Sequence, residues 1–344
     1  MTSGSPGRLI ILFAIPLMLG NICQQLYTMV DTMVVGQIAG VEALAALGAV
    51  DFLLWVVTGI STGLTQGFSI QLSQYYGAKD FENLRKSLAH SYRLTAFIAV
   101  GVFILSQSFA ALVLTGLHTP SNIIGMSLLY LRIIFCGIPA TAAYNMFAAA
   151  LRAMGNSKTP LTAMIIASVL NISLDILFVA GFGWGVAGAA IATVIAQSFS
   201  AVYCFLILRR IDIVHLSRAD FMTATGMTAR LMKLGIPVVF QNIIIGVGGL
   251  VVQYVINGYG FLFVAGFTAT NKLYGLLEMA AISYGYAIVT YVGQNLGAGR
   301  IDRIRKGVRS SMLLSLLTSL IISAAIFLFG KNILSLFISG EPQQ

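Results

Sequence analysis

Charge is what this sequence lacks most. Only 9% of its 344 residues are charged and 58% are hydrophobic, whereas soluble domains carry about 25% charged residues. So few charges cannot cover a soluble surface, which excludes a cytosolic enzyme and a disordered protein. The three cysteines all lie in apolar segments, where cysteine acts as a small hydrophobe, so a disulfide scaffold is excluded as well.

Motifs of catalysis are also missing. His90, His118 and His215 form no metal-ligand spacing, and the sequence has no cysteine pair, glycine-rich phosphate loop or triad spacing. The net charge of +9 is spread between apolar segments rather than gathered in a basic run. We therefore expect no enzyme activity, no cofactor and no nucleic-acid partner.

Long apolar segments dominate what is present, and none shows the period-2 alternation of a β-barrel strand. Nine segments reach the ~20 residues that cross a bilayer. They are residues 9–37, 44–76, 88–115, 121–153, 159–180, 184–208, 229–258, 263–296 and 306–329. The predicted fold class is an all-α, polytopic membrane protein.

The basic residues alternate with these spans. Seventeen of the 20 lysines and arginines precede the first span or follow an even-numbered one; the others are Arg132, Lys272 and Lys331. The positive-inside rule then places the N-terminus in the cytoplasm. We expect a multi-pass protein of the cell membrane, such as a bacterial inner or plasma membrane.

The chain also repeats itself. Three groups of residues recur at offsets of 221, 220 and 222: Ile15-Pro16 with Asn21 and Ile236-Pro237 with Asn242, Gly77-Ala78 and Gly297-Ala298, Leu114 with Pro120 and Leu336 with Pro342. Six spans separate the copies, so both halves share one orientation, as in a parallel repeat. We predict a first six-span lobe at 1–208, a cytoplasmic linker at 209–228 and a second lobe at 229–344.

The second copy is shorter than the first. It ends two residues after Pro342, whereas the first continues well past Pro120. We expect a chain truncated after nine of twelve spans, with little transport by itself and a complete form of about 430–460 residues. A genuine nine-span protein is the alternative.

Polar groups within a span mark function by default. In the first span they recur on one helical face: Asn21, Gln24, Gln25, Thr28, Asp31 and Thr32. Gln24, Gln25 and Thr28 are candidates for lining a substrate cavity. Pro16 removes a backbone hydrogen bond and is a candidate hinge, with a static kink as the alternative.

Later spans offer partners for Asp31. Asn171 and Asp175 share a helical face, and so do Thr193 and Gln197. If Asp31, Asn171, Asp175 and Thr193 converge, they supply hard oxygen ligands suited to Na⁺. Two close carboxylates also repel each other, so the pair could carry H⁺. A hydrogen-bonded network that only joins helices is the alternative.

Three further charges fall in spans. Asp51 begins the second span, and Lys272 lies beside its repeat equivalent in the eighth. We predict that the two approach between the halves as an outer gate; a snorkelling, unpaired Lys272 is the alternative. Glu278 is predicted to be buried in the second lobe, where it would attract a cationic substrate.

A set of motifs extends over essentially all 344 residues: Ile15-Pro16 through Asp31, Val34-Val35-Gly36, Ala45-Ala46-Leu47-Gly48, Gly77-Ala78, Ala150-Leu151-Arg152-Ala153-Met154-Gly155 with Lys158 and Pro160, Asn171 to Asp175, and Gly185-Val186-Ala187-Gly188-Ala189-Ala190. Together they resemble the multidrug and toxic compound extrusion (MATE) family of secondary transporters.

The resemblance implies two six-span lobes in a V. It implies export of drugs, toxic organic cations or metabolites in exchange for H⁺ or Na⁺, by a monomer in the lipid bilayer. It also implies a first-lobe cation site at Asp31, Asn171, Asp175 and Thr193. One branch of the family carries a glutamate in the seventh span, but residues 230–258 contain no acidic residue. This chain is therefore more similar to the branch that couples through the first lobe.

Two other functions remain as alternatives. A flippase for lipid-linked oligosaccharides, from the same superfamily, needs a cationic cavity, whereas the charges in these spans are mainly acidic. A membrane receptor or scaffold would use the polar residues only to hold helices together.

The outer gate can be tested directly. Neutralising both members, Asp51→Asn with Lys272→Gln, removes their attraction and should increase labelling of cysteines placed in the cavity by a reagent added outside. Labelling equal to that of the unchanged protein would contradict the gate.

Overall fold

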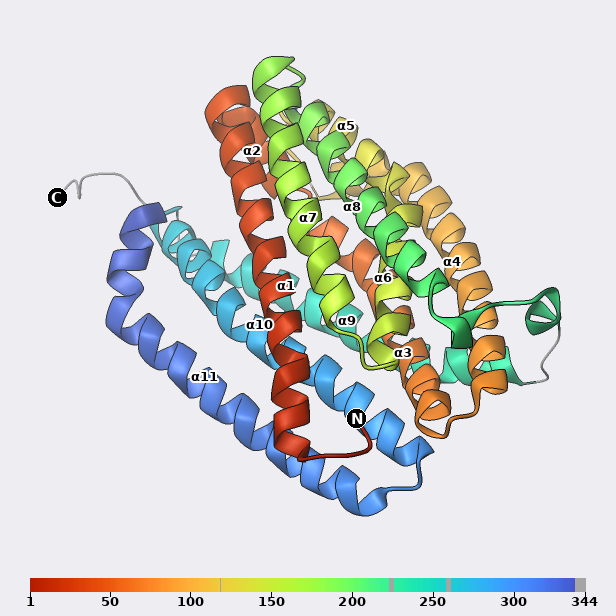
Figure 1. Cartoon of the computed structure of the whole chain (residues 1–344). Helices are drawn as coiled ribbons and strands as arrows, with labels where there is room; N and C mark the ends of the chain where they lie inside the picture. Colours follow the sequence, from red (N-terminus) through yellow and green to blue (C-terminus); the bar gives the residue numbers. More distant parts are fainter. Residues whose placement is uncertain (118, 223–225, 258–260, 338–344) are drawn as a thin grey trace.

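The computed structural model describes the backbone of residues 1–117, 119–222, 226–257 and 261–337. It describes their side chains except at 41, 52, 250, 253–254, 256–257, 261–274, 276–277 and 329–337. Every regular element in these ranges is a helix (Figure 1). The prediction of an all-α fold is confirmed.

The first six predicted spans are built from α-helices, two of them continued by a π-helical turn. In chain order they are α1 (Pro6–Val34) with η1 (Val35–Ala39), α2 (Val41–Gly48) with α3 (Asp51–Gly77), α4 (Phe81–Gly116), α5 (Ile124–Cys136) with α6 (Ile138–Ala153), α7 (Lys158–Asp175) with η2 (Ile176–Gly181), and α8 (Gly185–Arg209). Two 3₁₀ turns, η3 (Asp212–Val214) and η4 (Arg218–Phe221), lie in the linker. The chain continues with α9 (Met227–Asn257), α10 (Phe261–Gly297) and α11 (Ile301–Phe337).

The helices have the dimensions and composition of membrane spans. Within the described ranges seven of them are long and apolar enough to cross a bilayer, or eight if α5 and α6 form one bent span. The eighth predicted span, 263–296, coincides with the 37-residue α10. In the described residues, each of the nine predicted segments coincides with one or two of these helices.

The fourth predicted span, 121–153, is bent rather than continuous. Helices α5 and α6 meet at 46° around Gly137. Pro139 has no N–H to donate and therefore suits the first turn of a new helix, which here is α6. A side chain at Gly137 would come within 2.8 Å of a Val194 methyl group, so the glycine lets the bend approach α8.

The internal repeat is visible as a reciprocal contact between α3 and α10. A Cβ atom added to Gly77 would overlap the carbonyl oxygen of Gln294, and one added to Gly297 would overlap that of Gln74. Gly297 lies 220 positions after Gly77, and Gln294 lies 220 positions after Gln74, so the internal repeat relates the two contacts. The repeated Gly-Ala motifs therefore mark the place where the two halves cross.

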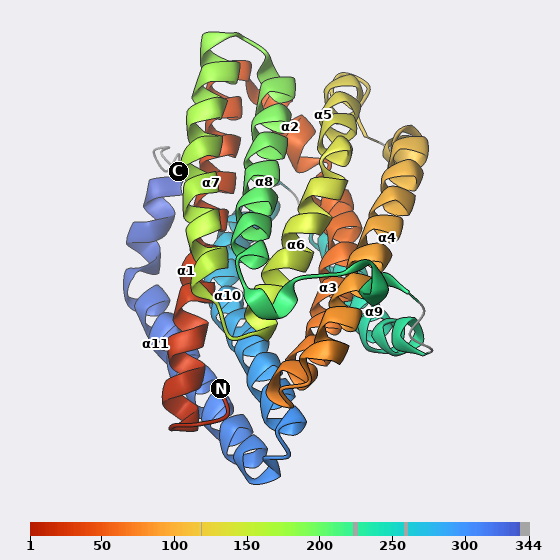
Figure 2. The ribbon, with the colours of Figure 1, turned by 45° about the vertical axis from the view of Figure 1, so that its right-hand side comes forward.

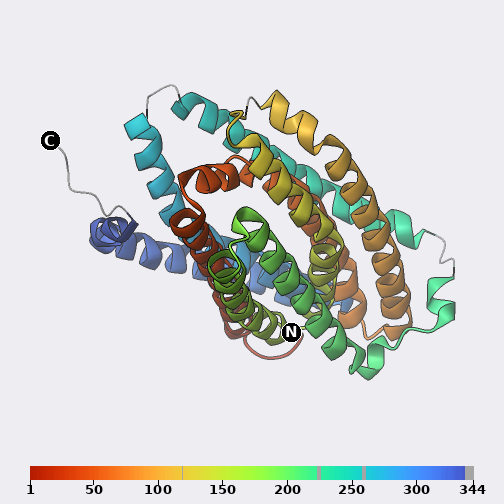
Figure 3. The same ribbon diagram turned by 90° about the horizontal axis from the view of Figure 1, so that it is seen from above.

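Other contacts join the halves at the same end of the molecule. Helix α3 packs most extensively on α9, where Gly67 lies against the backbone of Gly235. Arg303 binds the N-terminal segment, donating to the Gly4 carbonyl oxygen at 2.9 Å and to Asn295 Oδ1 at 3.0 Å. The N-terminus, the α3–α4 turn and the α10–α11 turn lie together at this end (Figures 1 and 2). Figure 3 shows the same helices from above, with the C-terminal part of α11 lying to the side of the first six spans.

The close contact of Gly77 and Gly297 between α3 and α10 predicts that a larger side chain there lowers the stability of the fold. Gly297→Ala should lower the stability of the folded protein by about 1–3 kcal/mol, because the new methyl group overlaps the backbone of α3. Gly285→Ala is the matched control in the same helix, since a Cβ atom there would have no atom of another described element within 4 Å. Thermal unfolding of both variants in detergent measures the difference. Equal melting temperatures would show that the crossing is not tightly packed.

Candidate functional site

The strongest candidate site lies where α1, α7 and α8 pack together (Figure 2). Asp31 of α1 is 5% exposed, and Asn171 and Asp175 of α7 are 0% exposed. Asn171 Nδ2 is 3.4 Å from Thr193 Oγ1 of α8, and the charges of Asp31 and Asp175 lie near enough to interact. The structure therefore brings together the four residues predicted from spacing.

Four side-chain oxygens of these residues are buried without a hydrogen-bond partner among the described residues. Asp31 Oδ1, Asn171 Oδ1 and both carboxylate oxygens of Asp175 are shielded from solvent and accept no hydrogen bond in the structure. A buried ion without a partner costs several kcal/mol. The oxygens therefore provide a site for a positive charge. We name Asp31, Asn171, Asp175 and Thr193 the acidic cluster.

Both acidic helices change their winding next to the carboxylates. Asp175 is the last residue of α7, and the π-helical η2 begins directly after it. Asp31 lies one turn before the π-helical η1, and the two π-helical turns contact each other. Short π-helical segments are rare and occur frequently at functional sites. The acidic cluster thus lies beside two segments whose backbone hydrogen bonds depart from the α-helical pattern.

Two residues next to the acidic cluster were not among the predicted cation ligands: Tyr27, which the sequence did not single out, and Gln197, which was noted only for sharing a face with Thr193. Tyr27 of α1 is buried one turn before Asp31, and its hydroxyl accepts a hydrogen bond of 3.2 Å from Gln197 Nε2. Gln197 follows Thr193 by one turn of α8. Its spacing from Thr193 was a signal for a shared face, whereas nothing in the sequence pairs it with Tyr27.

The remaining polar residues of α1 are more open. Gln24 and Thr28 are exposed, and Gln25 is half-buried. Thr28 Oγ1 donates to the Gln24 carbonyl oxygen at 2.9 Å, so this hydroxyl is used within its own helix. Pro16 is buried, and α1 continues through it without a break. These four residues remain candidates for the cavity and the hinge.

The two predicted gate residues, Asp51 and Lys272, and the predicted substrate-attracting Glu278 have different outcomes. Asp51 is the exposed first residue of α3, and its charge acts on that of Asp31. The side chain of Lys272 lies outside the described residues. Glu278 is exposed, so the prediction that it is buried is wrong. It lies two positions before Ala280, which begins the buried face of α10, and two positions turn the helix by about 200°.

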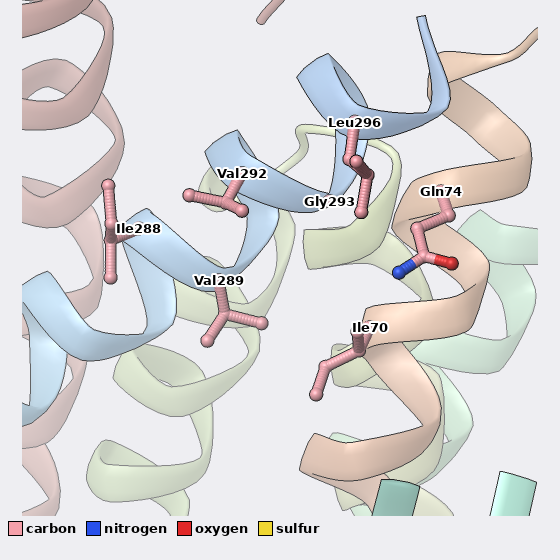
Figure 4. A pocket seen from close by; sticks show the side chains of 7 residues that line it. All are labelled: Ile70, Gln74, Ile288, Val289, Val292, Gly293 and Leu296. Carbon is pink, nitrogen blue, oxygen red and sulfur yellow. The ribbon is translucent and has the colours of Figure 1, made fainter. Parts of the chain in front are cut away.

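Two hollows lie away from the acidic cluster. One, of about 250 Å³, lies between α3 and α10 and is lined by Ile70, Gln74, Ile288, Val289, Val292, Gly293 and Leu296 (Figure 4). The other, of about 850 Å³, lies between α10 and α11. Neither is lined by a residue of the acidic cluster. In the described part of the chain, no group of three or more His, Cys, Asp or Glu side chains could hold a metal. A cation would therefore need the amide and hydroxyl oxygens too.

Comparison with known proteins decides the family. The sequence profile of the MatE family matches residues 16–177 and 237–342. The chain belongs to the MatE family. The predicted membership is confirmed, and with it the description of the chain as a multi-pass membrane protein of a transporter family.

Two relatives of this MatE chain come from Bacillus subtilis (strain 168). The probable multidrug resistance protein YoeA is 30% identical over 96% of this chain and 73% of its own length. The probable multidrug resistance protein YpnP is 31% identical over 99% of this chain and 76% of its own length. A solved structure of a MOP superfamily transporter from Pyrococcus furiosus superposes with a TM-score of 0.92 at 23% identity, covering 98% of this chain and 75% of that one. That superposition shows a shared fold.

The unpaired oxygens of the MatE chain predict an effect on stability. In Na⁺-free buffer near neutral pH, Asp175→Asn should raise the stability of the purified protein by on the order of 1 kcal/mol or more, because it removes a buried charge facing Asp31. Added NaCl should stabilise the unchanged protein and not the variant, since a ligand stabilises only the state that binds it.

Melting temperatures in NaCl and in choline chloride measure both effects. Asp212→Asn is the control, because it makes the same change at an exposed linker position. A variant that melts below the unchanged protein and keeps its response to Na⁺ would contradict the role of Asp175.

Proposed function

We propose that the protein exports small organic cations, including drugs, across the cell membrane in exchange for Na⁺ or H⁺. The observation that carries the proposal is the set of buried, unpartnered oxygens from α1, α7 and α8. The names of the two Bacillus relatives, both probable multidrug resistance proteins, support the substrate class.

A bound cation or proton would relieve the repulsion within the acidic cluster. Carboxylate, amide and hydroxyl oxygens are hard ligands, suited to a cation such as Na⁺. Two neighbouring carboxylates can instead share one proton, because both cannot be charged at low cost. Both ions would act at Asp31 and Asp175, so the same residues serve either form of coupling.

Ion binding can be linked to movement through the helices that carry the ligands. Asp31 and Asp175 lie on different helices, and η1 and η2 contact each other directly beyond them. Filling the site draws α1 and α7 together, whereas emptying it leaves two like charges to repel. A shift of this kind selects between two pre-existing states, as alternating access requires. Pro16 is the proposed point of bending in α1.

Substrate would enter between the lobes. Gln24, Gln25 and Thr28 on α1 offer polar contacts, while Asp51 and Glu278 offer negative charge to an organic cation. The proposed orientation places the basic end of the molecule, with the N-terminus, in the cytoplasm. The protein would work as a monomer, since both lobes belong to one chain.

Transport by inverted membrane vesicles tests the proposal, with the chain extended to the length of its relatives because little transport is expected from these nine spans alone. Vesicles loaded with Na⁺, or acidified inside, should accumulate a fluorescent cationic dye from outside as the ion leaves. Asp31→Asn should reduce this uptake at least tenfold while the protein remains in the membrane, because it removes a charge that binds the ion. Asp212→Asn should transport normally.

The two gradients are imposed separately. Uptake driven by Na⁺ alone would assign the cluster to Na⁺, and uptake driven by pH alone would assign it to H⁺. Dye uptake that survives unchanged in Asp31→Asn, or an unchanged protein that responds to neither gradient, would overturn the proposal.

A further inference from the structure

Gln197 connects α8 to the acidic cluster from a second side. Thr193 contacts Asn171 of α7, and one turn later Gln197 donates to the Tyr27 hydroxyl of α1. Helix α8 is thereby bonded to both helices that carry a carboxylate. Because α8 contacts both α1 and α7, a change in their relative position would alter its contacts.

The side-chain oxygen of Gln197 has no partner of its own. Its Nε2 is used by Tyr27, while Oε1 is buried and accepts no hydrogen bond. A buried amide oxygen left unpaired costs about 1–3 kcal/mol. The other unpartnered oxygens on α1, α7 and α8 are those of Asp31, Asn171 and Asp175. Gln197 Oε1 therefore shares their need for a positively charged or donating ligand.

Tyr27 holds the amide of Gln197 beside the acidic cluster. The tyrosine is 8% exposed and precedes Asp31 by one helical turn. In the structure its hydroxyl takes up the amide N–H, so the amide oxygen is left for a ligand.

An amide oxygen distinguishes between the two proposed ions. It can coordinate a metal cation, but it is not protonated near neutral pH, in contrast to a carboxylate. Removing it should weaken the binding of Na⁺ and leave the carriage of H⁺ by the carboxylates in place.

We infer that Gln197, positioned by Tyr27, is a specificity-determining residue that favours Na⁺ over H⁺ at the acidic cluster. The inference rests on the proposed function, because it needs the cluster to bind a cation. It adds α8 to the elements that respond to the ion, since loss of the ion leaves Oε1 unpaired.

The test compares Gln197→Met with the unchanged protein. Methionine keeps the unbranched shape and removes both polar atoms. Stabilisation by NaCl, with choline chloride keeping ionic strength constant, gives the half-saturating Na⁺ concentration. We expect it to rise about tenfold, since one hydrogen-bond-strength contact to a charged ligand is worth roughly that factor. Dye uptake driven by pH in the absence of Na⁺ should keep its rate and pH profile.

Two further variants keep the result interpretable. Tyr27→Phe leaves Gln197 in place but unanchored, and should shift the Na⁺ dependence in the same direction by a smaller factor, which also serves if Gln197→Met does not fold. Gln241→Met makes the same change at an exposed position of α9 and should have no effect.

The outcomes separate the two proposals. An unchanged half-saturating Na⁺ concentration in Gln197→Met, with Asp31→Asn losing its response, would overturn the role of Gln197 and leave the cation site intact. Equal loss of Na⁺-driven and pH-driven uptake would also overturn it, since a general structural role predicts that result. Absence of any Na⁺ response in the unchanged protein would overturn both this inference and the Na⁺ form of the proposed function.

Discussion

Two carboxylates buried without a positive partner are the constraint on which the rest of this molecule depends. Asp31 and Asp175 lie on different helices, and their oxygens find no donor among the described residues around them. A bilayer offers no solvent to stabilise such charges, so the surrounding helices must hold them, and their oxygens offer a site to a small positive ion. The amides of Asn171 and Gln197 make sense in this setting, because each places one polar group in a neighbouring contact and keeps an oxygen free.

The helices around this site pack closely where α7 meets α8, whereas the helical winding is irregular in η1 and η2. Helices α7 and α8 pack extensively on each other, and Gly188 lets Phe178 of η2 lie close to α8. On the other side, η1 and η2 interrupt regular α-helical winding directly beyond the carboxylates. Segments with fewer regular backbone bonds can change their winding at lower cost than a continuous helix. Local rearrangement is therefore available beside the two carboxylates.

Much of this architecture could be predicted from sequence because the membrane imposes simple rules. Apolar length identified the nine helical segments, and the spacing of Asn171 and Asp175 placed them on one face. The bend at Gly137, the π-helical turns and the Tyr27–Gln197 bond depend on contacts between distant segments, which periodicity does not encode. Glu278 is another example, because the position of a residue within a span does not show whether its face of the helix is covered by other helices.

The reciprocal crossing of α3 and α10 has a consequence for how such a chain is organised. Gly77 meets the backbone at Gln294, and Gly297 meets it at Gln74, so one surface is complementary to its own copy. That is the property of an isologous interface, which two identical subunits use around a two-fold axis. The two halves of this single chain therefore meet as the subunits of a homodimer would, and the linker after α8 fixes permanently a pairing that separate copies would have to find by diffusion.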